Sequence, residues 1–184
     1  MEEYTAAHVA NYFLISSKRL KNIVMNPLKL MKMVYFSYAW YLHLTNSTLF
    51  DEQIEAWKHG PVIPSLYHEF KHLGLYGNIK ESCATNLDLN SDDPEPTIPL
   101  FDIDTLENND HINEAVCGVW MRYKECSAEE LEKISHNKNS AWLKLYKENK
   151  NVILDNETIK QEGMHNYNES KEILNKHRKG KLVN

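Results

Sequence analysis

The sequence predicts a mostly α-helical domain of the α+β class, with a β-hairpin or short sheet near residues 49–63. Over most of the chain, apolar residues recur every three or four positions, which is the spacing of one helix face. Around residues 54–59, apolar and polar side chains instead alternate, as in a half-buried strand. Gly60 and Pro61 follow directly and form a turn signal. We therefore expect residues 1–184 to form a single helical domain.

The composition is typical of a soluble globular protein. The chain has 184 residues, of which 42% are hydrophobic and 26% are charged. A chain of this length buries enough apolar surface to fold without disulfides. The three cysteines form no CxxC pair, so we expect free thiols and a reducing compartment, here the cytoplasm.

Charge and hydropathy argue against nucleic acid and membranes as partners. The formal net charge is −5, whereas binding to a phosphate backbone needs a basic face. The basic residues gather only near the C-terminus, and we interpret residues 179–184 as a solvated basic tail. The start of the chain is acidic, unlike a signal peptide. The most apolar run, residues 33–42, is too short to cross a bilayer.

The first half of the chain predicts two helices. Residues 5–17 have helical spacing of apolar side chains. Asn26 and Pro27 then provide a cap and a first-turn proline for a second helix. That second helix is apolar on most of its circumference, which predicts a central helix packed on several sides. Trp40 is therefore expected in the core.

The middle of the chain continues with a strand, a turn and a third helix. The third helix is expected to open at Pro64 and to end at Gly74 in a left-handed cap. Residues 75–100 have the composition of a loop. Within them, residues 80–100 form an acidic, proline-containing segment that is either a plain connector or a part that orders on binding a partner.

The second half is again predicted to be helical. Residues 112–123 have helical spacing, and Ser127 with Glu130 forms a capping box for the next helix. Residues 140–150 show the same helical pattern. Residues 155–161 have the pattern of a capped helix start, and residues 168–179 that of a final helix.

Residues 68–72, His-Glu-Phe-Lys-His, match the zinc protease pattern. On a helix, His68 and His72 would share one face and could bind Zn²⁺, with Glu69 as general base. However, a catalytic zinc needs a third protein ligand, and no later residue is marked as one. We therefore favour the interpretation that both histidines lie on the polar face of a short helix, and keep a zinc metallohydrolase as a minor alternative.

No other catalytic pattern is present in the sequence. It contains no GxSxG motif and no glycine-rich phosphate loop. Cys117 lies within an apolar helical pattern, where a thiol is usually inert. The sequence thus favours a protein that is not an enzyme and has no cofactor.

Residues 26–73 contain a Pro-Leu-Lys-Leu-x-Lys helix, a Leu-Phe-Asp-Glu turn, a Glu-Ala-Trp-x-x-Gly-Pro-Val segment and a Tyr-His-x-Phe helix, followed later by a Ser-His helix end before a tryptophan. In these motifs the chain resembles the Panacea domain, also called the SocA-like antitoxin domain. The resemblance extends over about residues 9–159, and Ala141 stands where the family usually has proline. The residues that carry the motif include Lys29, Lys32, Tyr35, Trp40, Glu55, Gly60, His136 and Trp142.

The resemblance implies an antitoxin that neutralises a toxin encoded by a neighbouring gene through direct protein contact. A relative that delivers its toxin to an ATP-dependent protease provides the alternative of a proteolytic adaptor. Large amphipathic side chains near the predicted turn are typical of protein interfaces. We expect the toxin to bind there, through Trp57, Lys58, His59, Pro61 and Tyr67. A winged-helix regulator that binds nucleic acid is a further alternative, which the net charge disfavours.

Overall fold

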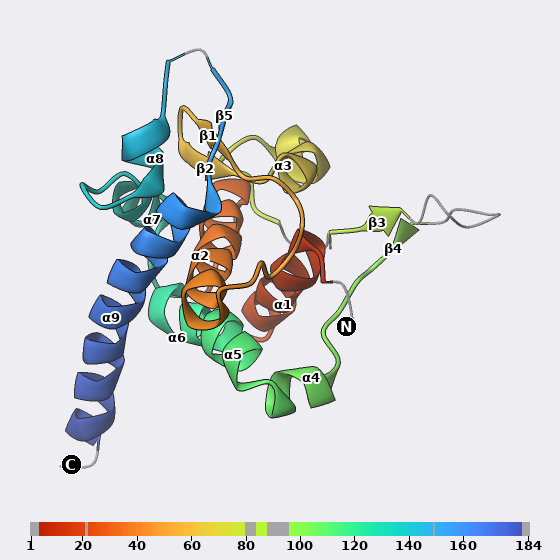
Figure 1. Ribbon diagram of the computed structural model, residues 1–184. Helices are drawn as coiled ribbons and strands as arrows, with labels where there is room; N and C mark the ends of the chain where they lie inside the picture. The colour runs from red at the N-terminus through yellow and green to blue at the C-terminus, as the bar shows by residue number, and fades with distance from the viewer. Residues whose placement is uncertain (1–3, 21, 80–83, 88–95, 149, 182–184) are drawn as a thin grey trace.

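Helix α2 (Pro27–Thr45) runs through the centre of the molecule (Figure 1). The computed structural model describes residues 4–20, 22–79, 84–87, 96–148 and 150–181. As predicted, Pro27 occupies the first turn, and the Asn26 side chain accepts a hydrogen bond of 2.9 Å from the Lys29 N–H. Fifteen of the 19 residues of α2 are buried, on all sides of the helix. This confirms the prediction of a central helix.

The other main helices surround α2. Helices α1 (Ala6–Lys18), α6 (Gly118–Tyr123), α7 (Ala128–Ser135) and α9 (Asn156–Lys181) all pack against it. Between them the chain forms the short helices α4 (Ile103–Asn108), α5 (Asp110–Ile112) and α8 (Ala141–Leu145), and a π-helical turn at Asn113–Cys117. The largest fully buried side chains come mostly from α2 and its neighbours, and include Trp40, Tyr35, Tyr123, Phe13 and Phe36. The fold class is confirmed: the domain is mostly helical.

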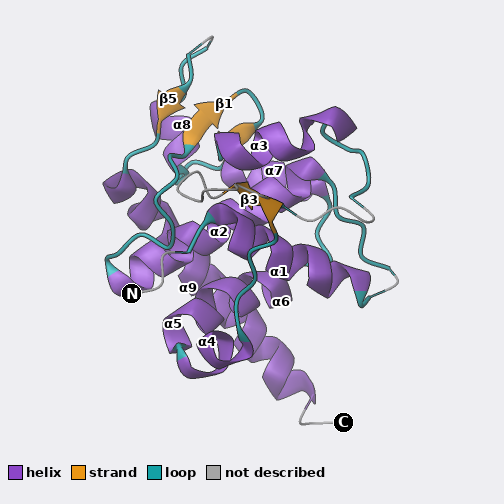
Figure 2. Cartoon of the chain, turned by 90° about the vertical axis from the view of Figure 1, so that its right-hand side faces the viewer, coloured by secondary structure: helices purple, strands orange, loops and turns teal. Residues whose placement is uncertain are grey.

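A small antiparallel sheet covers one end of α2, as Figure 2 shows from the side. Strands β1 (Glu55–Trp57) and β2 (Gly60–Val62) form the expected hairpin, in which Trp57 pairs with Gly60. The turn therefore lies at residues 58–59, two residues before the Gly60-Pro61 turn signal, which instead begins β2. On the other edge of β1 lies β5 (Val152–Ile153), which pairs Ile153 with Glu55 and was not predicted.

Helix α3 (Pro64–Phe70) follows the hairpin and ends earlier than predicted. A 3₁₀ turn at Lys71–Leu73 separates it from Gly74, which has φ 64° and ψ −169° and so forms no left-handed cap. Within the segment predicted as a loop, β3 (Asn86–Leu87) pairs with β4 (Pro96–Thr97). Most of the acidic segment 80–100, namely residues 80–83 and 88–95, lies outside the described residues, as do residues 182–184 of the basic tail.

The chain ends in one long helix, α9, where the sequence suggested two separate helical patterns. Gly163 lies in the middle of α9 and packs directly against the backbone of α2. A Cβ atom at this position would overlap the carbonyl group of Ala39. The absence of a side chain at Gly163 thus sets how closely α9 approaches the central helix.

We expect Gly163→Ala to destabilise the protein. In an isolated helix this change gains about 1 kcal/mol. Here the added methyl meets backbone that no side-chain rotation can move, and overpacking of this kind typically costs about 1–3 kcal/mol. The free energy of unfolding, measured with a chemical denaturant, should fall. Met164→Ala, at a side chain that is 41% exposed, serves as the control and should change stability little. A Gly163→Ala protein as stable as the wild type would contradict this packing.

Candidate functional site

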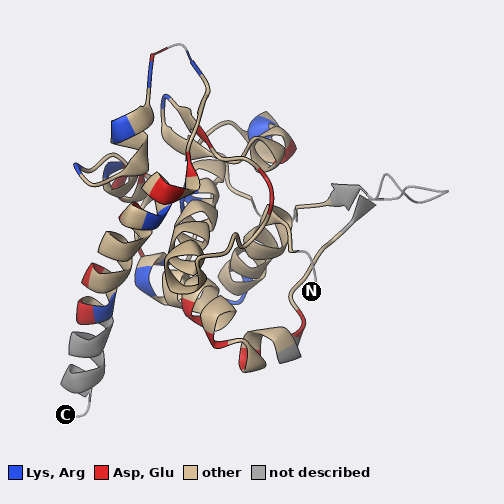
Figure 3. Cartoon of the chain, viewed as in Figure 1, with Lys and Arg blue, Asp and Glu red and all other residues tan. Residues whose placement is uncertain are grey.

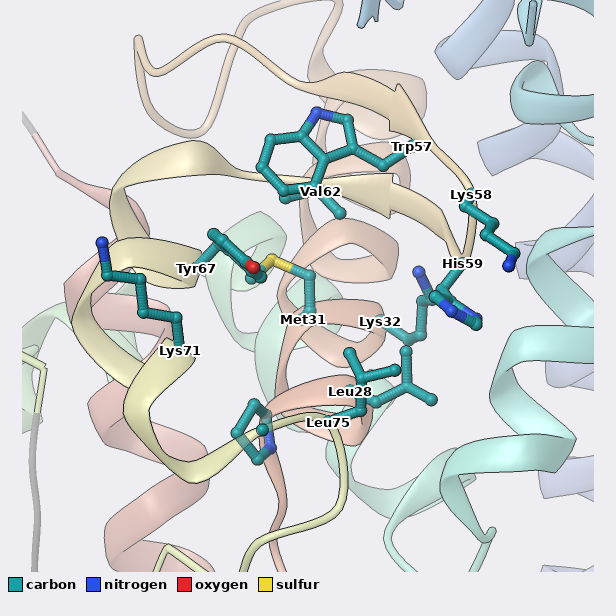
Figure 4. A pocket seen from close by; sticks show the side chains of 12 residues that line it. Leu28, Met31, Lys32, Trp57, Lys58, His59, Val62, Tyr67, Lys71 and Leu75 are labelled. Atoms are coloured by element: carbon teal, nitrogen blue, oxygen red, sulfur yellow. The ribbon is translucent and has the colours of Figure 1, made fainter. Parts of the chain in front are cut away.

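A pocket of about 270 Å³ opens between α2, the β1–β2 hairpin and α3 (Figure 4). Its floor is apolar and comes from α2 and from the segment after α3. Its walls come from the hairpin and α3. The residues that define it best are Leu28, Met31, Lys32, Trp57, Tyr67 and Leu75.

Trp57 and Tyr67 form an aromatic wall of this pocket. Their rings meet edge to face, with centroids 4.7 Å apart. The indole N–H of Trp57 donates to a carboxylate oxygen of Glu55 at 2.6 Å, which fixes the ring relative to the strand. Both side chains are half-buried: one side packs on the core and the other borders the pocket. Trp57 therefore contributes to the core and to the surface.

The other residues predicted to bind the toxin divide into exposed and buried groups. Lys58 is exposed at the hairpin turn, and His59 next to it contacts Glu132 of α7, with Nδ1 2.8 Å from the carboxylate. Both line the pocket. Pro61 is buried in β2 and does not line it. Four of the five predicted residues thus meet around one pocket, and Pro61 lies behind it.

Lys32 connects the pocket to the hairpin. Its side chain is fully buried, and its ammonium donates to the Pro61 carbonyl oxygen at 3.0 Å. Gly60 has φ 99°, and a Cβ atom there would lie 2.6 Å from Lys32 Nζ. A glycine is therefore required for the hairpin to approach the amine. Burial lowers the pKa of Lys32 to about 7, and the carboxylates of Glu132 and Glu162 oppose that shift.

His136 and Trp142 attach the hairpin to the second half of the chain. Their rings stack with centroids 3.8 Å apart, and the Trp142 indole N–H donates to the Trp57 carbonyl oxygen at 2.7 Å. Nε2 of His136 is buried and has no hydrogen-bond partner among the described residues. Burial, together with the nearby Lys32 ammonium, lowers the pKa of His136, which favours the neutral ring. The motif residues of the hairpin, α2 and α7–α8 thus meet in space.

Glu162 is a buried ionisable residue that no sequence pattern indicated. It lies on α9 with no exposed surface and accepts hydrogen bonds from the Tyr35 hydroxyl at 2.5 Å and the Ala141 N–H at 2.7 Å. Burial raises the pKa of Glu162 to about 7. Ala141 is the position where the resembled family usually has proline. A proline would have no N–H to donate to this carboxylate.

The remaining motif residues, Lys29, Trp40 and Glu55, support the fold. Lys29 is buried, and its ammonium donates to the Lys124 carbonyl oxygen at 2.6 Å, which ties α2 to the start of the α6–α7 turn. Trp40 is buried in the core as predicted. Glu55 holds the Trp57 indole, as described above.

The His-Glu-Phe-Lys-His segment does not lie on one continuous α-helix. Helix α3 ends at Phe70, so His72 falls in the 3₁₀ turn, and both histidines are exposed. Glu69 instead accepts a hydrogen bond from the Thr85 hydroxyl at 3.1 Å. Across the described residues, no group of three or more His, Cys, Asp or Glu side chains is placed to hold a metal ion.

Charged residues of both signs occur along the molecule. Figure 3 shows acidic and basic positions on α9 and among the elements around the hairpin. Within the described part of the chain, no helix combines the length and the apolar character needed to cross a membrane.

Comparison with known proteins identifies the family. The model of the SocA-like antitoxin family, Panacea domain, matches residues 30–143, which contain most of α2, the hairpin, α3 and the helices through most of α8. This match covers more than half of the chain, so the chain belongs to that family. No curated protein and no solved structure matches it.

We expect stability to depend on pH through Glu162. The pKa of this carboxyl is about 7 in the folded protein against an ordinary value of 4.5, so the folded state binds the proton more tightly. Its contribution to stability is complete below pH 4.5 and is lost as the pH rises to about 7. Relative to Glu162→Gln, which cannot ionise, the wild type should lose about 3 kcal/mol across this range.

Denaturant unfolding at a series of pH values measures this difference. Glu157→Gln, at an exposed position in the first turn of α9, is the matched control. Its free energy of unfolding should change with pH in parallel with that of the wild type. Parallel curves for the wild type and Glu162→Gln would show that Glu162 does not titrate in this range.

Proposed function

We propose that this protein is an antitoxin that neutralises its toxin by direct binding, and that the toxin docks on the hairpin end of the molecule. Membership of the SocA-like antitoxin family supports the general role. The convergence of Trp57, Lys58, His59 and Tyr67 around one pocket supports the location. We call this surface, made by these four residues and the pocket between them, the docking face.

The chemistry of the docking face suits a protein partner. Tyrosine and tryptophan are enriched where interfaces bind most tightly, because they bury much area at a low cost in conformational entropy. Trp57 and Tyr67 are half-buried and held by defined contacts, so they are already ordered before a partner binds. A preorganised surface loses less entropy on association. In this proposal Pro61 contributes indirectly, by presenting its carbonyl to Lys32 and so fixing the hairpin.

Growth under co-expression tests the proposed function. The product of the adjacent reading frame is expressed alone and then together with this protein. The proposal expects arrested growth in the first case and restored growth in the second, with the two proteins purifying as a complex. Rescue accompanied by a protease-dependent fall in toxin level would indicate a proteolytic adaptor instead. No arrest by the neighbour, or no rescue with both proteins well expressed, would contradict an antitoxin role.

Trp57→Ala should weaken neutralisation. Truncation of an aromatic anchor at an interface typically reduces affinity by about 30-fold or more. Pull-down yield and growth rescue should both fall, while circular dichroism confirms the fold. Met121→Ala is the control, since Met121 is 56% exposed on α6 and outside the pocket. Lys58→Glu gives a second variant at an exposed side chain, where a folding defect is not expected. Full neutralisation by both folded variants would place the toxin elsewhere.

A further inference from the structure

We infer that the pocket of the docking face accepts one side chain of the toxin, an aromatic or aliphatic anchor flanked by a carboxylate. This inference rests on the proposed function and specifies the chemistry of the partner. Three observations carry it: the size of the pocket, the apolar character of its floor, and the sign of the charges that line it.

The size of the pocket fits a single side chain. Its volume is about 270 Å³, whereas pockets for drug-sized ligands and cofactors typically occupy about 300–1,000 Å³. At protein interfaces, the residues that contribute most to affinity fill small, desolvated pockets on the partner. A pocket of this size beside two ordered aromatic rings has the form of such an acceptor.

The floor of the pocket selects an apolar group. Leu28, Met31 and Leu75 line it, together with the inner faces of Trp57 and Tyr67. The Met31 sulfur already accepts a hydrogen bond from the Ile63 N–H at 3.2 Å. Thioethers and aromatic rings make favourable contacts with aromatic groups. A polar group placed on this floor would lose its water without gaining a partner.

The two exposed charges at the rim of the pocket are both cationic. They come from Lys58 and Lys71 at the two sides, while the Lys32 amine below them is buried and bonded to Pro61, and no Asp or Glu lines the pocket (Figure 4). This contrasts with the net charge of −5 for the whole chain. Lys58 makes no hydrogen bond or ion pair with any described residue, while the Lys71 amine lies 3.5 Å from Nδ1 of His68.

Two carboxylates lie close to the pocket, and both are already engaged. Glu55 accepts from the Trp57 indole, and Glu132 contacts His59. Neither is among the residues that line the pocket. A carboxylate on the partner would therefore meet Lys58 at the rim, whereas a Lys or Arg anchor would meet only like charge. The pocket should therefore bind an acidic segment of the partner more tightly than a basic one.

A fragment pair tests the chemistry of the pocket without the toxin. The probes are 3-(4-fluorophenyl)propionate and 4-fluorophenethylamine, which share the ring and differ in charge. Their binding is followed by ¹⁹F NMR. We expect the carboxylate to bind with a dissociation constant of about 1 mM, as suits a ligand of this size, and the amine to bind at least about fivefold more weakly. Equal binding of the two probes, or tighter binding of the amine, would overturn the inference.

Two pairs of variants locate the binding. Leu75→Trp fills the pocket and keeps the backbone carbonyl that accepts from the Leu28 N–H, while Tyr76→Trp places the same indole at a neighbouring side chain that is 53% exposed and outside the lining. We expect only Leu75→Trp to abolish fragment binding. Lys58→Glu should weaken the carboxylate about fivefold, and Lys138→Glu, at an exposed lysine away from the pocket, should leave it unchanged.

The same variants are then tested with the product of the adjacent reading frame. Leu75→Trp should reduce its binding about 30-fold or more, and Tyr76→Trp should not. If Leu75→Trp binds and neutralises like the wild type, the pocket inference fails while the antitoxin role stands. If the wild type does not neutralise the neighbour, the proposed function fails, and the fragment series still decides the chemistry of the pocket.

Two other occupants would be recognised by the same experiments. A change in oligomeric state for Leu75→Trp alone, seen by analytical ultracentrifugation, would assign the pocket to a second copy of this chain. Fragment binding that does not compete with the neighbouring protein would assign it to a small aromatic acid. Either result would overturn the inference that the pocket holds a side chain of the toxin.

Discussion

The fold depends on two polar side chains of the buried helix α2, Lys32 and Tyr35, which both need a hydrogen-bond partner. They lie three residues apart, on neighbouring positions of the helix surface, and both are fully buried. A buried hydrogen-bond donor without a partner lowers the stability of the fold about as much as a typical destabilising mutation does. A buried charge without a partner lowers it more. Lys32 finds its acceptor on the hairpin at Pro61, and Tyr35 finds Glu162 on α9. These two hydrogen bonds set where the hairpin and the last helix can lie.

This constraint explains why so many motif residues are buried although they surround the docking face. Gly60 must lack a side chain because Lys32, Ser135 and His136 crowd its α-carbon. Trp142 holds the hairpin from the other side through the Trp57 carbonyl. The hairpin is therefore fixed from α2 and from α8, and only its outer surface is available to a partner. The motif specifies the scaffold, and in the proposed mode of binding the exposed positions around the pocket determine which partner is recognised.

The sequence revealed the parts of the fold that local patterns determine. The cap at Asn26 and the capping box at Ser127 both formed as predicted, because each depends on residues within one turn. Strand β5 was missed because two residues pair with β1 across about a hundred positions of the chain, which no local pattern records.

Glu162 was missed for a different reason. The buried face of α9 carries Ile159, Glu162, Asn166, Tyr167 and Ser170 at helical spacing, but three of these five side chains are polar. A search for apolar periodicity interprets such a face as solvent-exposed. Only the structure shows that Glu162 is enclosed by Tyr35 and the N-terminus of α8. The pocket is likewise invisible in the sequence, since α2, the hairpin and the Leu75 segment meet only after folding.

The protonation of the buried groups changes stability without changing the docking face. The pKa values of Lys32 and Glu162 both lie near 7, one lowered and the other raised by burial. Above pH 7 the folded state favours a neutral Lys32 amine, yet that amine still has hydrogens to donate to Pro61. Below pH 7 a protonated Glu162 still accepts from Ala141 through its carbonyl oxygen. Because the hydrogen bonds to Pro61 and Ala141 survive the change of charge, the hairpin keeps its position across neutral pH. The affinity of the pocket for a partner should then depend on the charges at its rim and on the charge of the partner.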